Sequence, residues 1–117
     1  MTAAATEQST LFDVVELVHA PADPSLSIGE RFDRFHTDNP WVYRALESLC
    51  EGWLAQGHKR VGVKQMFEVV RWQYGMKTTG DGGFRVNNDF TSRYARMLIE
   101  QHPEWADAIE TRRLRAV

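Results

Sequence analysis

The dipeptide Asn39-Pro40 constrains the fold of this chain more than any other feature, because it divides the most strongly periodic region into two helices. Proline fits the first turn of a helix but disrupts its interior, and asparagine is a favoured residue immediately before that turn. We therefore expect one helix over 28–38 and a second over 40–56. Ser27 starts the first with the spacing of a capping box, and Gly57 suits the end of the second.

Apolar spacing predicts two further helices, over 63–75 and 90–102. Between them, short alternating runs surround a glycine-rich turn, which predicts a β-hairpin near 76–87. The inward-facing positions of the helices should form one hydrophobic core, made by Leu46, Trp53, Phe67, Val70, Tyr74 and Leu98.

The order of these elements is that of a helix-turn-helix followed by a wing. We therefore expect a mainly α fold with a small β-hairpin, a winged-helix-like single domain over 27–117. Residues 1–26 should form a flexible N-terminal segment, because they are small, polar or proline-rich and show little periodicity. A chain of 117 residues has the usual length of one domain.

Composition excludes several classes of function. The single Cys50 cannot form an internal disulfide, and no apolar run is long enough to cross a membrane, so we expect a cytoplasmic protein. The four histidines and Cys50 lack the close pairing of zinc ligands. Glu30, Asp33 and His36 share a helix face, but the arginines between them indicate an ordinary charged surface. We expect no cofactor, no metal and no enzymatic activity.

Charge is distributed unevenly along the chain, although its net value is only −2. Residues 1–58 carry nine acidic and three basic side chains, whereas residues 59–96 carry eight basic and three acidic ones. A basic middle region favours a double-stranded DNA partner, with 63–75 as the recognition helix and the hairpin as a wing. The side chains expected to contact DNA are Lys64, Gln65, Arg71, Lys77, Arg85, Arg93 and Arg96.

Two alternatives accompany this hypothesis. Trp72 lies beside the apolar stripe of its helix, so it is either a second core contact or an exposed anchor in a module that binds another protein. The run 87–96 combines cap-forming residues with Thr91, Ser92 and two arginines, which suits a phosphate at a helix N-terminus. It equally suits a helix cap with surface arginines, and we favour that interpretation because the glycine-rich cradle of phosphate loops is missing.

Several short motifs resemble those of a family of small uncharacterised proteins from actinobacterial phages and prophages. The resemblance covers about residues 28–115 and depends on Phe32-x-x-Phe35-His36, Asn39-Pro40-x-Val42-Tyr43, Val61-Gly62-Val63-Lys64, Phe67-Glu68-x-x-Arg71-Trp72, Asn87-Asn88-x-Phe90, Ser92-Arg93-Tyr94-Ala95-Arg96 and Glu110-Thr111-Arg112. It implies a phage-derived protein in the cytoplasm of a bacterial host cell, where the partner of a protein-binding module would be a host or phage protein, and it leaves the role open.

Overall fold

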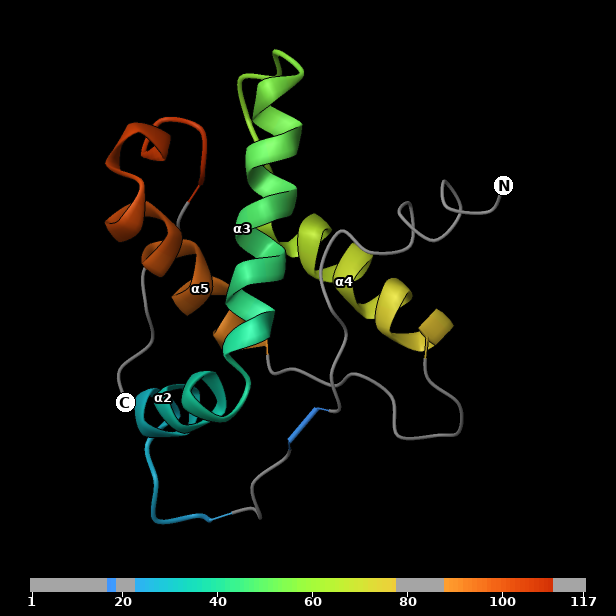
Figure 1. Ribbon diagram of the computed structural model, residues 1–117. Helices are drawn as coiled ribbons and strands as arrows, with labels where there is room; N and C mark the ends of the chain where they lie inside the picture. The colour runs from blue at the N-terminus through green and yellow to red at the C-terminus, as the bar shows by residue number, and fades with distance from the viewer. Residues whose placement is uncertain (1–16, 19–22, 78–87, 111–117) are drawn as a thin grey trace.

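The computed structural model describes residues 17–18, 23–77 and 88–110. These residues form the α-helices α2 (Ile28–Asp38), α3 (Pro40–Ala55), α4 (Val63–Lys77) and α5 (Asn88–Gln101), followed by the 3₁₀ helix η1 (Pro103–Trp105). In Figure 1, α3 stands at the centre, α2 lies near its N-terminal end, and α4 and α5 lie lower in the view than its C-terminal end. Helix α4 packs against both α3 and α5, and α2 packs against the same two helices.

The start of α2 is the capping box that the sequence predicts. The Ser27 hydroxyl accepts a hydrogen bond from the Glu30 backbone N–H at 3.1 Å, and the Glu30 carboxylate accepts one from the Ser27 N–H at 2.9 Å. Both bonds supply a side-chain acceptor to a backbone N–H group that has no partner within the helix. The helix buries Phe32 and Phe35, and it ends at Asn39 as expected.

Asn39 does not cap α3 with its side chain, as the sequence suggests that it would. The fully buried amide instead binds the N-terminal segment: its Oδ1 accepts from the Val18 N–H at 2.7 Å, and its Nδ2 donates to the Val18 carbonyl at 2.8 Å and to the Phe35 carbonyl at 3.1 Å. Leu17 is buried beside it, and the Leu17 N–H donates to the Tyr74 hydroxyl at 3.2 Å. This pairing ties the segment before α2 to α3 and α4.

The connection between α3 and α4 follows the predicted stop at Gly57. Gly57 has a φ of +101°, a backbone conformation that side chains with a Cβ rarely adopt. The chain then runs past the exposed residues 58–60 to Val61, whose N–H donates to the Ala108 carbonyl at 3.0 Å. Val61 and Ile109 form an isolated parallel β-bridge, which draws the residues before α4 against those after η1.

The predicted fold class is wrong. Helix α4 does not stop at Gly75 but continues through Met76 to Lys77, so the residues expected to begin the hairpin are helical. The described part of the chain is all-helical, with the single bridge at Val61 as its only β pairing. Residues 78–87, which hold the remainder of the expected hairpin, lie outside the described residues. A winged helix is therefore replaced by a compact helical fold.

Tertiary contacts explain why α4 passes Gly75, although glycine costs about 1 kcal/mol inside a helix. Tyr74 is buried against Trp41 of α3, with ring centroids 5.9 Å apart, and its hydroxyl accepts from Leu17. These contacts hold the last turns of α4 on the core.

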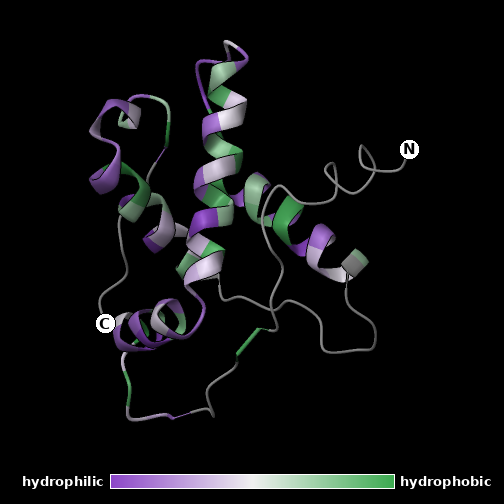
Figure 2. Cartoon of the chain, viewed as in Figure 1, coloured by the Kyte–Doolittle hydropathy of each residue, from purple (hydrophilic) through white to green (hydrophobic). Residues whose placement is uncertain are grey.

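The core joins all four described α-helices and confirms most of the expected inward positions. Tyr94 of α5 is fully buried between Phe32 of α2 and Phe67 of α4, at ring-centroid distances of 4.7 and 5.5 Å. Of the predicted core residues only Trp53 is half-buried rather than buried. Figure 2 shows the resulting alternation of hydrophobic and hydrophilic residues along the central helix α3.

Candidate nucleic-acid interface

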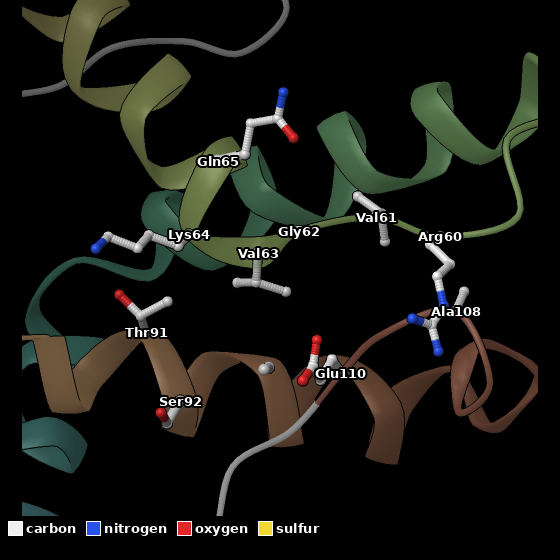
Figure 3. A pocket seen from close by; sticks show the side chains of 11 residues that line it. Arg60, Val61, Gly62, Val63, Lys64, Gln65, Thr91, Ser92, Ala108 and Glu110 are labelled. Carbon is white, nitrogen blue, oxygen red and sulfur yellow. The ribbon is translucent and has the colours of Figure 1, made fainter.

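A groove of about 520 Å³ lies where α4 begins, with α5 opposite (Figure 3). One wall is the stretch that enters α4, the second is the first turns of α5, and the third is the segment after η1. The lining residues are Arg60, Val61, Gly62, Val63, Lys64, Gln65, Thr91, Ser92, Ala95, Ala108 and Glu110. The hydrogen bond from Val61 to Ala108 therefore holds two of the three walls together.

The start of α4 brings unpaired backbone N–H groups to this groove. The first amide of the helix that donates to a preceding carbonyl is that of Met66, which bonds Gly62 at 3.1 Å. The amides of Val63, Lys64 and Gln65 precede that bond, and amides in this position carry the positive end of the helix dipole. This end of the groove is thus suited to negative charge.

Two cationic side chains, Arg60 and Lys64, add to this potential from either side of the helix start. Both residues are exposed, and no ion pair involves either of them among the described residues. The backbone of Arg60 is fixed because its carbonyl accepts from the Trp53 indole N–H at 2.7 Å. The Trp53 ring in turn stacks on His58 at 3.8 Å. The Arg60 backbone is therefore held by Trp53, while the Arg60 side chain is exposed to solvent.

The opposite walls supply hydroxyls and one carboxylate. Thr91 and Ser92, on the first turns of α5, are half-buried and line the groove. Figure 3 shows the Thr91 side chain extending towards the start of α4, and the Glu110 carboxylate standing between α5 and the stretch Val61–Val63. Among the described lining residues Glu110 alone is acidic, so this part of the lining carries two cations and one anion.

The exposed polar face predicted for the recognition helix is present on α4. Lys64, Gln65, Glu68 and Arg71 are all exposed. Arg71 forms an ion pair with Glu68, with its Nε 3.5 Å from a carboxylate oxygen, and both side chains are about half exposed. Part of the positive charge of Arg71 is therefore neutralised on its own helix.

The other predicted DNA contacts do not join this surface. Arg93 and Arg96 are half-buried and do not line the groove, and the Arg93 guanidinium lies over Gly29 of α2. Lys77 is the last residue of α4, and Arg85 lies outside the described residues. The structure thus brings Lys64 and Gln65 together and separates them from the arginines of α5.

Trp72 is 65 % exposed, which favours the anchor interpretation over a second core contact. Met76, one turn further along α4, is 67 % exposed. An exposed tryptophan beside an exposed methionine is unusual on a water-facing helix.

Arg60, Ala108 and Glu110 line the groove but were not predicted from the sequence as members of a site. The basic stretch that starts at Lys59 was a signal for Arg60, whereas no local pattern links Ala108 or Glu110 to the start of α4. Only the pairing of Val61 with the segment after η1 brings them there.

Other reactive groups in the described residues are buried or dispersed. No set of three or more metal-ligating side chains gathers in this part of the chain. Burial raises the pKa of the Cys50 thiol to about 11, which disfavours the reactive thiolate. None of the described helices has the length and hydropathy of a membrane span. Comparison with protein-family models, curated proteins and solved structures yields no match.

Proposed function

We propose that this chain binds double-stranded DNA through phosphate contacts at the groove where α4 begins. The observation that supports this proposal is the convergence of Arg60, Lys64 and the unpaired amides of α4 on one groove. The proposal does not depend on a wing.

Phosphate oxygens match this set of groups. Backbone N–H groups at a helix start bind anions directly, and flanking lysine and arginine side chains add charge-assisted hydrogen bonds. The hydroxyls of Thr91 and Ser92 can donate further bonds, as hydroxyls often do in contacts with the DNA backbone. The groove is too small for a duplex but large enough for a phosphate group of a strand lying across its mouth.

The exposed face of α4 then provides contacts beyond the phosphate. Gln65 and Arg71 are exposed on the same helix as Lys64, and their side chains are of the types that reach base edges in the major groove. Because Arg71 is paired with Glu68, its engagement requires that ion pair to open. Phosphate contacts position the protein, and sequence preference comes from these two residues.

The decisive measurement is the salt dependence of binding to a fluorescent duplex by anisotropy. Replacing both Arg60 and Lys64 by alanine should lower the slope of log affinity against log salt by about 2, one unit for each lost phosphate contact. Arg34→Ala is the matched control, because Arg34 is an exposed arginine on α2 that does not line the groove. Its slope should equal that of the wild type.

Glu110→Gln provides a test of opposite sign. It removes the one carboxylate among the described lining residues, so binding should tighten. If the wild type fails to bind duplex at micromolar concentration in about 50 mM salt, where nonspecific binders register, the proposal is wrong. The proposal is also wrong if the double alanine variant of Arg60 and Lys64 has the same salt dependence as the wild type, Arg34→Ala and Glu110→Gln.

A second candidate function, docking of a host or phage protein, is favoured by the exposure of Trp72 and Met76. Aromatic and methionine side chains are enriched at the centres of protein interfaces. A partner held in this way should be lost with Trp72→Ala and kept with Arg34→Ala, as measured by calorimetry on the purified pair. Its affinity should vary little with salt, which separates it from phosphate binding.

A further inference from the structure

His102, immediately after α5, lies between two carboxylates from different elements. Its Nε2 is 2.6 Å from a carboxylate oxygen of Glu47 on α3, and its Nδ1 is 3.4 Å from one of Glu104 in η1. An ionised carboxylate only accepts hydrogen bonds, and a neutral imidazole carries one N–H. Both contacts therefore form together only when His102 is protonated.

The groups around this ring all favour its charged form except the burial itself. The hydrogen bond with Glu47 is the main cause that raises the pKa of His102, followed in the same direction by Glu104, while partial burial lowers it. Glu47 is also within hydrogen-bonding reach of the Tyr43 hydroxyl at 3.5 Å. The His102 side chain is 22 % exposed, so water screens part of the effect.

A continuous set of contacts leads from His102 to the wall of the groove. Its ring stacks on buried Trp105 at 3.9 Å, and the Trp105 carbonyl accepts from the N–H groups of Ala108 and Ile109 at 2.9 and 3.0 Å. The Ala108 carbonyl then accepts from Val61 at 3.0 Å, just before α4. The bond from His102 to Glu47 thus joins η1 to α3, and η1 in turn holds the segment that lines the groove.

We propose that His102 is a proton-controlled latch that holds the groove wall in place, so that DNA affinity falls when His102 loses its proton. This proposal rests on the proposed function for its DNA readout. Because the folded-state pKa is raised, the stabilisation is complete below the ordinary histidine pKa and is lost as pH rises through the raised value. The pH range over which the latch opens therefore lies above the ordinary pKa of histidine.

The first test measures, in the wild-type chain, how firmly Val61 is bonded to the segment that lines the groove. The pKa of His102 is measured by NMR titration of its ring protons, and the protection factor of the Val61 amide by hydrogen exchange, corrected for the intrinsic pH dependence of exchange. Protection should fall as His102 titrates. A Val61 protection factor that stays constant while His102 loses its proton overturns the latch.

The second test measures duplex affinity across the same pH range at constant ionic strength. Wild-type affinity should fall by about threefold to tenfold through the His102 titration, the size of one hydrogen bond's net contribution. His102→Gln should bind weakly with a flat profile. His58→Gln is the control, because it removes an exposed imidazole that stacks on Trp53 and takes no part in the contacts of His102 with the two carboxylates, so the affinity should fall with pH as in the wild type.

The two tests separate the latch from the proposed function. Loss of Val61 protection without any DNA binding supports the latch and refutes the proposed function. DNA binding whose affinity does not follow the His102 titration, or which loses its pH dependence in His58→Gln instead, refutes the latch and leaves the proposed function standing.

Discussion

Replacing Asn39 by alanine should lower the free energy of unfolding by about 2 to 3 kcal/mol. The amide makes three hydrogen bonds, at 2.7, 2.8 and 3.1 Å, and each contributes about 0.5–1.5 kcal/mol net. The expected loss is below three times the largest contribution of a single bond, because Val18 is 48 % exposed and water can solvate its freed backbone groups. The Phe35 carbonyl also keeps its bond from the Asn39 backbone N–H at 2.8 Å.

Urea unfolding followed by circular dichroism measures this loss, and a double-mutant cycle assigns it. Val18→Pro removes the donor of the 2.7 Å bond, so it should cost about 1 kcal/mol beside Asn39 and clearly less beside alanine. Val18→Ala keeps both backbone groups and should stay within about 0.5 kcal/mol of wild type. Additive effects of Asn39→Ala and Val18→Pro would refute the assigned bond.

Three further perturbations test the fold. Phe67→Ala should cost about 3–5 kcal/mol in urea unfolding, because the side chain is 3 % exposed, and a loss below about 1 kcal/mol would contradict its burial. Gly57→Ala should cost about 1 kcal/mol by the same measurement, since its φ of +101° disfavours a Cβ, and a stabilising change would refute that strain. Cys50 should react with a thiol reagent at neutral pH only after unfolding, because burial raises its pKa to about 11; rapid reaction of the native chain would contradict this.

Elements with local signals were predictable from the sequence. Ser27 and Glu30 are three residues apart, so both partners of the capping box appear in one helical turn, and the structure confirms it. Gly57 likewise marks the end of α3 by its own conformational freedom. The helices over 28–38 and 40–56 were predicted to within one residue of their observed ends.

Features that depend on distant partners were not predictable in this way. Asn39 looks like an ordinary helix cap because its actual partner, Val18, lies 21 residues away. Gly75 looks like a helix stop because the contacts of Tyr74 with Trp41 and Leu17 come from other elements. In both cases a tertiary contact overrides a local preference of about 1 kcal/mol.

The distribution of charge along the sequence predicts even less well which side chains share one surface, and α5 shows why. Successive residues of a helix are rotated by about 100°, so Arg93 points some 200° away from Thr91 although the two are close in sequence. Thr91 consequently lines the groove while Arg93 lies over α2.

The basic side chains of residues 59–96 thus lie on different faces of the protein. Their number in the sequence is therefore larger than the number that can contact one phosphate. The groove instead combines cations from the start of α4 with hydroxyls from α5 and with an anion that no basic stretch includes. This is why the sign of the Glu110→Gln effect tests the groove more sharply than the loss of any single cation.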